Sequence, residues 1–450
     1  MWKDHYEGIL NCMQPRQYLV DKAKFDASAI VTAAEIHDCM DVDVHIVPVV
    51  KDYRGKLSNA DNYRPIAIAS CISKLIECCI LNRIEEKISV TENEFGFKKG
   101  LGTDSCIFVL KEMIDKFRSC NTNSFLVFLD ASKAFDKVRH DLIYMKLEKA
   151  GIPVYIIGLI KFWYAAQSMF IRWNGHVSER FRCSNGVKQG GILSPFLFNY
   201  YLNDLSIALN NMSVGCCLNK PINHLLYADD LVLISPSKKG IMRLIQTCET
   251  FAMEHSMAFN TIKSKFMVIK AKAYKCFDFG SISLNGNVLE QVASFRYLGH
   301  ILSDDATDDN DIMRHCRYLY TVDNSLIRRF GFCNTRIKLK LFPVYCGNIY
   351  TGHLWHNYKS NSLNKVKVAY NSILRRLLNI PRVDNGKSYS ASAMFVQHNI
   401  RNFSALIRNA LSSFCFRMNR SPHSMLIYLN GINQITSSSW DHYRDALYTS

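Results

Sequence analysis

The chain has 450 residues, of which 48% are hydrophobic and 21% charged, so it holds enough apolar material for two or three packed domains and is not a disordered chain. Most of its net charge of +16 lies after position 310, where 19 Lys and Arg face five Asp and Glu. The 16 cysteines form no C-x-x-C pair, which argues against a disulfide framework and favours a reducing, intracellular location in the nucleus or cytoplasm. Neither a signal peptide nor a membrane-spanning segment is expected.

Hydrophobic periodicity predicts strands and helices along most of the chain. Apolar residues at helical spacing occur in residues 72–88, 107–117, 134–147, 194–209, 240–255 and 366–378. Apolar runs of strand length occur at residues 124–129, 224–227, 231–234 and 265–269. The two middle runs predict a hairpin, and the order β-α-α-β-β-α-β predicts an α+β fold. The acidic stretch at 303–311 is predicted to be a domain boundary.

Three aspartates stand where strands are predicted to end. Asp130 directly follows the run 124–129, and Asp229 and Asp230 form the tip of the predicted hairpin. Because Asp130 and Asp229 are 99 positions apart, they meet only if a sheet pairs their two strands. Hard cations prefer oxygen ligands, so this trio predicts two Mg²⁺ ions, with Mn²⁺ as an alternative, that catalyse phosphoryl transfer. For each single aspartate, a plain turn residue is the alternative.

Short sequence blocks around these aspartates occur in a characteristic order. They span residues 47–51, 62–66, 95–100, 129–136, 186–195, 227–230, 260–264 and 295–299. Together they resemble the reverse transcriptases of non-LTR (LINE-type) retrotransposons. The resemblance implies an RNA-directed DNA polymerase with a right-hand fold. Its expected parts are an N-terminal extension (1–30), fingers (31–120), a palm (121–302), a basic helical thumb (303–390) and a C-terminal extension (391–450).

The resemblance also implies which residues bind the incoming dNTP. They are Lys51, Arg64, Phe135, Gln189 and Lys263. The finger cations Lys51 and Arg64 are expected to contact the triphosphate. The ring of Phe135, five residues after Asp130, is expected to crowd the sugar 2′ position and so favour dNTP over rNTP, with a core aromatic as the alternative. Gln189 lies in a glycine-flanked turn that allows close approach to the nascent base pair, and a plain turn is the alternative.

The partners follow from two further blocks and from the charge distribution. Gly96 and Phe97 are implied to face the template, and Tyr297, Leu298 and Gly299 to hold the primer end. The expected partners are therefore an RNA template, a DNA primer and dNTPs, with no membrane. The basic, aromatic-rich region after position 310 predicts binding to nucleic-acid backbone, and a solvated basic face is the alternative.

Other functions stay open at the level of sequence. No acidic pattern of an endonuclease precedes position 47, so the nicking domain is expected to be absent from this chain. The chain is predicted to be a polymerase, but a catalytically silent or domesticated RNA-binding relic is an alternative, as is an intron-maturase-type reverse transcriptase. Primer extension on an RNA template separates an active polymerase from a silent relic.

Overall fold

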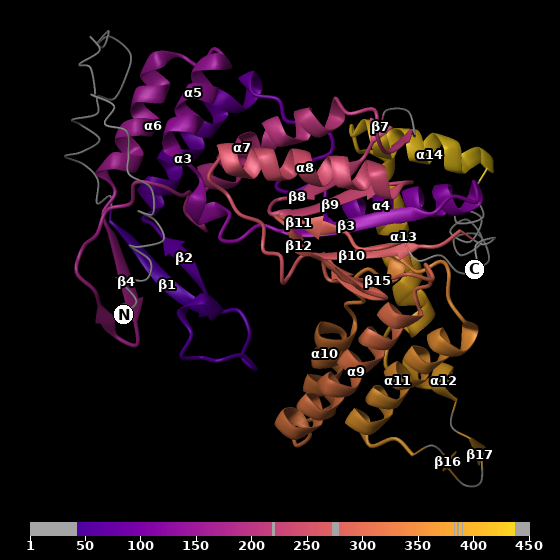
Figure 1. Ribbon diagram of the computed structural model, residues 1–450. Helices are drawn as coiled ribbons and strands as arrows, with labels where there is room; N and C mark the ends of the chain where they lie inside the picture. Colours follow the sequence, from indigo (N-terminus) through magenta and orange to yellow (C-terminus); the bar gives the residue numbers. More distant parts are fainter. Residues whose placement is uncertain are drawn as a thin grey trace.

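The computed structural model describes residues 43–436 except 218–220, 272–278 and positions 382, 385, 386 and 389. The predicted extension at residues 1–30 and the chain after 436 lie outside the described residues. Figure 1 shows a central sheet covered by helices, from which a smaller sheet and a group of helices extend as two separate lobes. The predicted α+β class is confirmed.

The central sheet has the strand order β13-β10-β3-β9-β8. Its strands are β3 (Ser124–Asp130), β8 (His224–Tyr227), β9 (Asp230–Ser235), β10 (Lys265–Ile269) and β13 (Glu290–Gln291). β3 lies in the middle and is antiparallel to both β9 and β10. The predicted strands, the hairpin and the pairing between the strands of the two aspartate segments are therefore confirmed.

Helices cover both faces of the central sheet. In β3, Val127 packs in one core with α7 (Leu193–Asn210) and α8 (Lys238–Glu254). Its neighbour Leu126 packs in a second core with α4 (Thr103–Ser119). Successive side chains of a strand point to opposite faces, so β3 is apolar at every position from Phe125 to Leu129 because both of its faces are buried. The helices predicted at 107–117, 194–209 and 240–255 are confirmed as α4, α7 and α8.

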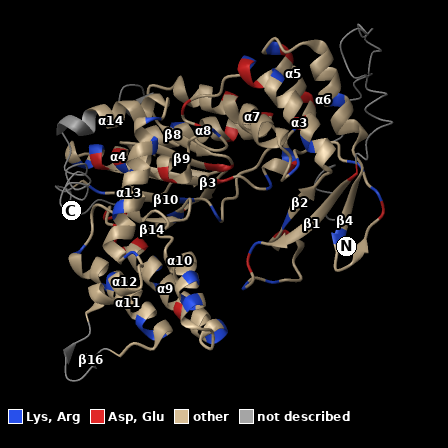
Figure 2. Cartoon of the chain, turned by 180° about the vertical axis from the view of Figure 1, so that it is seen from behind, with Lys and Arg blue, Asp and Glu red and all other residues tan. Residues whose placement is uncertain are grey.

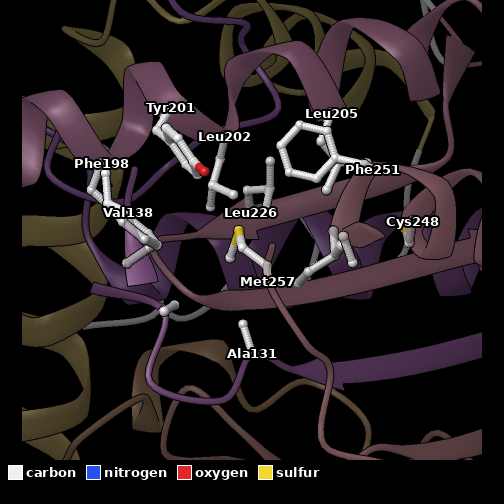
Figure 3. Packing of buried hydrophobic residues seen from close by; sticks show 14 of the residues in the cluster. Ala131, Val138, Phe198, Tyr201, Leu202, Leu205, Leu226, Cys248, Phe251 and Met257 are labelled. Atoms are coloured by element: carbon white, nitrogen blue, oxygen red, sulfur yellow. The ribbon is translucent and has the colours of Figure 1, made fainter. Parts of the chain in front are cut away.

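The chain after β3 departs from the predicted helix at 134–147. A 3-10 turn, η3 (Phe135–Lys137), is followed by α5 (His140–Lys149). Val138, between them, is extended and lies fully buried near Phe198 in the first core (Figure 3). The helix is interrupted because another segment takes the carbonyls: the backbone N–H of Gly186 donates to Val138, and that of Val187 to Phe135, both at 2.8 Å.

A smaller outer sheet has the order β2-β1-β4-β5. Its strands are β1 (Val44–Val50), β2 (Tyr63–Ile68), β4 (Met169–Trp173) and β5 (His176–Val177). Beside it in Figure 1 stand α3 (Cys71–Ile84), α5 and α6 (Val154–Ala166). α3 confirms the predicted helix at 72–88, which ends in a separate turn, η2 (Glu85–Lys87). The predicted element order is wrong between positions 151 and 177, because α6, β4 and β5 intervene there.

The C-terminal helices, α9–α12, form the second lobe. They are α9 (Asp309–Phe330), α10 (Thr335–Cys346), α11 (Ser360–Leu378) and α12 (Ala391–Gln397), and they share a third core. α11 confirms the helix predicted at 366–378. The last described helices are α13 (Phe403–Asn419) and α14 (Ser424–Thr436). α13 begins in the third core with Phe403 and reaches the second core, where Phe414 meets Phe108 of α4 at a ring distance of 5.4 Å and where α14 also packs. The chain thus returns to the central sheet after forming the lobe.

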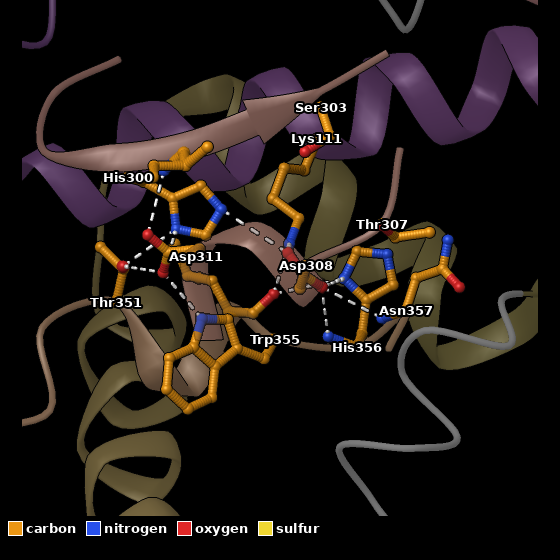
Figure 4. Close-up of polar contacts among 12 residues, drawn as sticks. Lys111, His300, Ser303, Thr307, Asp308, Asp311, Thr351, Trp355, His356 and Asn357 are labelled. Carbon is orange, nitrogen blue, oxygen red and sulfur yellow. Dashed lines mark hydrogen bonds and ion pairs between the residues drawn. The ribbon is translucent and has the colours of Figure 1, made fainter. Parts of the chain in front are cut away.

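A buried polar junction connects the C-terminal helices to the central part of the fold (Figure 4). Lys111 of α4 donates to Asp308 at 2.5 Å. His300, in strand β15 (His300–Ser303), lies between two aspartates, 3.6 Å from Asp308 and 3.2 Å from Asp311. Burial raises the pKa of both aspartates, but the Lys111 charge at Asp308 and the His300 hydrogen bond at Asp311 outweigh it and hold each pKa well below its usual range. The predicted boundary at 303–311 therefore contains two buried, paired acids.

The remaining elements are short. They are β6 (Cys216–Cys217), β7 (Pro221–Ile222), β11 (Ser283–Leu284), β12 (Asn287–Val288), β14 (Ser294–Tyr297), β16 (Val383–Asp384), β17 (Lys387–Ser388), η1 (Ala60–Asn62) and η4 (Gly352–Leu354). None of the helices in the described part of the chain combines the length and the apolarity that a bilayer crossing needs.

Candidate active site at the tip of the central hairpin

The three predicted aspartates meet at one edge of the central sheet. Asp130, the last residue of β3, is the register partner of Asp230, the first residue of β9. Tyr227 also pairs with Asp230 across the β8–β9 hairpin, so Ala228 and Asp229 form a two-residue turn. Ala228 has a left-handed backbone, with φ of 56°. Residues that face each other in antiparallel strands have Cα atoms about 5 Å apart, so the hairpin brings the carboxylates together.

The electrostatics of this edge suit a bound cation. Asp229 and Asp230 reach solvent at the tip, but protein surrounds them closely enough that burial raises the pKa of both. The charges of Asp229 and Asp130 add to this effect and raise the pKa of Asp230 to about 6. Carboxylates that repel one another in this way gain from a divalent ion, which favours their charged form.

Side chains alone do not complete a metal cage here. Among the residues that the structure describes, no three His, Cys, Asp or Glu side chains are arranged to enclose an ion. Mg²⁺ is commonly held by one or two carboxylates together with waters and substrate phosphates. The aspartate trio therefore fits Mg²⁺ that shares its ligands with a phosphate-bearing substrate.

Cations from separate segments face the aspartates. Lys263, in the loop before β10, lies 3.5 Å from the Asp130 carboxylate. The same loop is fixed by the backbone of Asn260, whose N–H donates to the Asp130 carbonyl at 2.8 Å. The charges of Arg64, in β2, and of Lys263 both lower the pKa of Asp229, against the effect of burial. Four of the predicted dNTP-binding and metal-binding positions, two cations and two aspartates, therefore interact electrostatically.

Lys51 belongs to the same group. It follows β1, and its amino group donates to the Asp61 carbonyl at 2.9 Å. Partial burial lowers its pKa, and the charges of Lys263 and Arg64 lower it further. The charges of Arg64 and Lys263 thus act on both Lys51 and Asp229. The dNTP-binding role of the three cations stays a prediction.

The ring of Phe135 has partners on two sides. It stacks on Phe198 of α7, with ring centroids 4.2 Å apart, and meets Phe97 edge to face at 6.2 Å. The ring is half-buried, whereas Phe97 is exposed. This position is compatible with a steric gate that is supported from behind by Phe198, and equally with a residue at the margin of the core. The gate role stays a prediction.

Gln189 lies where the outer sheet meets the central part of the fold. The Ala67 N–H donates to the Gln189 carbonyl at 2.8 Å, and the Gln189 side chain hydrogen-bonds to Asp136. Gly190, which follows, has φ of 118°, and a Cβ there would lie 2.6 Å from the Ala67 carbonyl oxygen. Asp136 is buried, which raises its pKa to about 6 against the charges of Lys133 and Lys51. The turn is therefore tightly held on both sides.

A buried ion pair supports this turn and was not predicted. Lys188 donates to Glu77 of α3 at 2.6 Å, and both side chains are almost fully buried. The other carboxylate oxygen accepts the backbone N–H of Ile192 at 2.6 Å, beside the start of α7. A carboxylate at a helix N-terminus accepts hydrogen bonds from the free N–H groups there and interacts favourably with the positive end of the helix dipole. Lys188 lay inside the block 186–195, but no sequence signal identified Glu77 as its partner.

The predicted primer-holding residues form the β14–β15 turn. Leu298 and Gly299 have positive φ values of 45° and 85°. Tyr350 donates to the Leu298 carbonyl at 2.6 Å, and its ring lies against Gly299, where a Cβ would be only 2.8 Å from it. The Tyr297 side chain points into the second core and contacts Cys106 at 3.3 Å. In this turn Leu298 and Gly299, rather than the Tyr297 ring, are near the surface.

Comparisons with known proteins agree with these features. A model of the family described as reverse transcriptase (RNA-dependent DNA polymerase) matches residues 52–302. The chain is 29% identical to the retrovirus-related Pol polyprotein from type-1 retrotransposable element R2 of Popillia japonica, over 60% of this chain and 39% of that protein. It is 24% identical to the RNA-directed DNA polymerase from mobile element jockey of Drosophila funebris, over 75% of this chain and 37% of that protein.

The chain therefore spans less than two fifths of these two curated relatives, 39% and 37% of their lengths. Among solved structures, it is similar to telomerase from Candida Tropicalis in complex with a TWJ fragment of telomeric RNA. The identity is 10% and the TM-score 0.43, over 90% of this chain and 64% of that chain.

Proposed function

Because the chain belongs to the reverse transcriptase (RNA-dependent DNA polymerase) family, we propose that it copies an RNA template into DNA by adding dNTPs to a primer 3′-hydroxyl. The family match and the retrotransposon relatives confirm the resemblance read from the sequence blocks, and with it the right-hand class of fold. The observation that carries the proposal is the pairing of β3 with β9, which sets Asp130 opposite Asp230 at the hairpin tip.

We propose that the three aspartates act together with the facing cations. Two Mg²⁺ ions, or Mn²⁺, held by Asp130, Asp229 and Asp230 would activate the 3′-hydroxyl and stabilise the leaving pyrophosphate. Lys51, Arg64 and Lys263 would neutralise the triphosphate, which is supported by the position of Lys263 and Arg64 near Asp130 and Asp229 and by the electrostatic coupling of Lys51 to both cations. The backbone of Asp130 is held by the loop before β10, and its carboxylate pairs with Lys263 of that loop, at 3.5 Å, one of the cations assigned to the triphosphate.

The sugar and base of the nucleotide are selected nearby in this proposal. Phe135 would close the space at the 2′ position, and its stacking on Phe198 supports a fixed ring. Gln189 would line the nascent base pair, with Gly190 allowing close approach of the backbone. Phe97 faces the same region, since its ring contacts Phe135, whereas its neighbour Gly96 is buried against the hairpin turn at Ala228.

Residues 31–120, 121–302 and 303–390 would then act as fingers, palm and thumb, with 391–450 as a C-terminal extension. The thumb and the chain beyond it carry most of the net charge, and Figure 2 shows Lys and Arg along the C-terminal helices. Tyr320 and Phe332 are exposed on the same lobe. Cations with interleaved aromatics suit a primer-template backbone, and the β14–β15 turn would hold the primer end.

Primer extension tests the polymerase proposal directly. The protein is incubated with an RNA template, a DNA primer, dNTPs and Mg²⁺, and the wild type is expected to extend the primer. Asp130→Asn and Asp229→Asn are expected to abolish extension without lowering stability, because each removes a ligand and relieves repulsion. Asp304→Asn, which changes an exposed aspartate elsewhere, is the matched control. A wild type that binds primer-template but never extends it would instead favour the catalytically silent relic.

A salt titration tests the thumb proposal. Three exposed cations of α9 and α10 are replaced by Gln in one variant: Arg317, Arg336 and Lys340. Three cations at the start of α8, on the central part of the fold, are replaced in the control: Lys238, Lys239 and Arg243. Each lost phosphate contact reduces the slope of log affinity against log salt by about 0.9. A flatter slope is expected only in the first variant, and equal slopes would contradict the thumb assignment.

A further inference from the structure

A short segment before α4 runs alongside the catalytic hairpin. The backbone N–H of Leu226 donates to the Asn93 carbonyl at 2.9 Å, and that of Phe95 donates to the Leu226 carbonyl at 2.8 Å. Glu94, between them, therefore forms a parallel bridge to β8, the edge strand of the central sheet. The segment extends the hydrogen bonding of the sheet toward the hairpin tip, where the aspartates lie.

The side chain of Glu94 reaches the turn itself. It is buried, with 3% of the residue exposed. Its Oε1 atom accepts two backbone N–H groups, from Gly96 at 2.6 Å and from Ala228 at 3.3 Å. Oε2 has no hydrogen-bond partner in the structure. Ala228 is the left-handed residue that immediately precedes Asp229, so this acceptor acts on the backbone that orients the tip.

Gly96 makes the contact sterically feasible. A Cβ on Gly96 would lie 2.5 Å from the Ala228 nitrogen, which is closer than real Cβ atoms come to any heavy atom. The Gly96 carbonyl in turn accepts the side-chain amide of Asn199, in α7, at 2.7 Å. A chain of hydrogen bonds therefore runs from α7 through Gly96 and Glu94 to the turn, and ties the tip to a rigid helix.

We propose that Glu94 is a positioning residue of the polymerase site, whose Oε1 fixes the left-handed backbone of Ala228 and thereby the direction of the Asp229 and Asp230 carboxylates. The inference rests on the proposed function, because it concerns the geometry of the same aspartates. Non-glycine residues adopt a left-handed backbone rarely, so the turn needs a specific partner to keep it. Glu94 does not itself touch substrate, since its carboxylate is buried behind the turn.

The role of Glu94 depends on the acceptor atom rather than on charge. Burial raises the pKa of Glu94 to about 7, although the N–H groups of Gly96 and Ala228 oppose the shift. Whether or not the other oxygen is protonated, Oε1 still accepts both bonds. Glu94→Gln also keeps an oxygen acceptor in this place. Glu94→Leu removes the acceptor and replaces it with an apolar side chain of similar size. These two substitutions therefore separate the hydrogen bond from simple space filling.

The test compares Glu94→Leu, Glu94→Gln and Glu112→Leu, which removes another buried glutamate from α4 and serves as the control for general destabilisation. Because small misplacements of reacting groups are costly, Glu94→Leu is expected to lower kcat for primer extension on the order of 10- to 100-fold, with the dNTP KM unchanged. Its half-saturating Mg²⁺ concentration is expected to rise. Glu94→Gln is expected to keep kcat close to the wild-type value. Glu112→Leu is expected to leave the Mg²⁺ dependence of extension unaltered.

A second measurement does not depend on activity. Hydrogen exchange of the peptide that contains Ala228, followed in the metal-free protein, is expected to be faster in Glu94→Leu than in wild type or Glu94→Gln. Equal exchange in all three proteins overturns the inference, as does a Glu94→Gln variant that loses as much kcat as Glu94→Leu. If the wild type does not extend primers, the proposed function fails, while the exchange measurement still decides whether Glu94 holds the turn.

Discussion

Replacing Lys111 with Met is expected to destabilise the protein far more than an equivalent change at the surface. The Lys111 amino group lies 2.5 Å from Asp308 and 2.6 Å from the Leu354 carbonyl, and it joins α4 to the start of α9. The two charged side chains are 10% and 4% exposed. Met has a similar length but no charge, so the substitution leaves the carboxylate of Asp308 buried without its cation.

The structure sets the size of this effect. Removing one partner of a buried ion pair costs about 3 to 5 kcal/mol, because the remaining charge stays desolvated. Asp308 keeps two backbone donors, the N–H groups of His356 at 2.9 Å and Asn357 at 3.1 Å, which place the cost near the lower end. Loss of the hydrogen bond to the Leu354 carbonyl adds to the cost. We therefore expect about 3 kcal/mol for Lys111→Met.

Lys265→Met is the matched control. Lys265 pairs with Glu290 at the similar distance of 2.6 Å, but the glutamate side chain is 66% exposed. Exposed pairs contribute about 0 to 1 kcal/mol, since water replaces the lost partner. Urea unfolding of both variants and the wild type gives the two free-energy differences in one assay. Equal losses in the two variants would refute the idea that burial of the Lys111 pair determines its contribution.

The same pair has a pH signature. The folded pKa of Asp308 is held below its usual range, so its ionised form stabilises the protein above the unfolded pKa of about 3.9, and this contribution is lost as pH falls through the folded pKa. Loss of Lys111 raises the folded pKa, so the variant binds a proton at pH values where the wild type does not. The stability gap between them is therefore expected to narrow as pH falls, and a gap independent of pH would contradict this sign.

Four further substitutions address the candidate site. Phe135→Val is expected to weaken the preference for dNTP over rNTP by roughly 10- to 100-fold while dNTP use survives, and an unchanged preference in competition assays would make the ring a core residue only. Lys51→Ala and Arg64→Ala are each expected to raise the dNTP KM roughly 10-fold with template affinity unchanged; the reverse pattern would assign them to the nucleic acid. Gly190→Ala is expected to reduce extension by displacing the turn, whereas Gly286→Ala, which also has positive φ but meets open space, is not.

Local patterns predicted the strands of the candidate site correctly because both partners carry strong signals. The run from Phe125 to Leu129, directly before Asp130, is apolar at every position, and the runs on either side of Ala228 and Asp229 are largely apolar too. A strand that is apolar on both faces is buried only in the middle of a sheet that is covered on both sides. The pairing of β3 with β9 then follows from bringing the acids together, and the register confirms it.

The sequence did not reveal which segments far apart along the chain pack or pair with one another. β4 pairs in parallel with β1, so that Val44 faces Met169, and nothing in either strand encodes the other. α6 is apolar on nearly all sides, so it lacks the 3.6-residue period that identifies an amphipathic helix. The return of α13 to α4 depends on packing such as Phe414 against Phe108, which is not visible in a single sequence. Glu94 was missed for the same reason: its partner Ala228 is 134 positions away.

The charges of the site point to the kind of ligand that completes it. On one side, burial and the neighbouring aspartates raise the pKa of Asp230. On the other, burial together with Lys263 and Arg64 lowers the pKa of Lys51. Burial and like charges thus oppose the charged form of Asp230 and of Lys51, and an added opposite charge favours the charged form of each. A simple anion would stabilise the charged form of the lysines and the arginine but not of the aspartates. A simple cation would stabilise the aspartates but not the basic residues. A metal-bound polyphosphate satisfies both, and this is the charge argument for the nucleoside triphosphate that we propose as substrate.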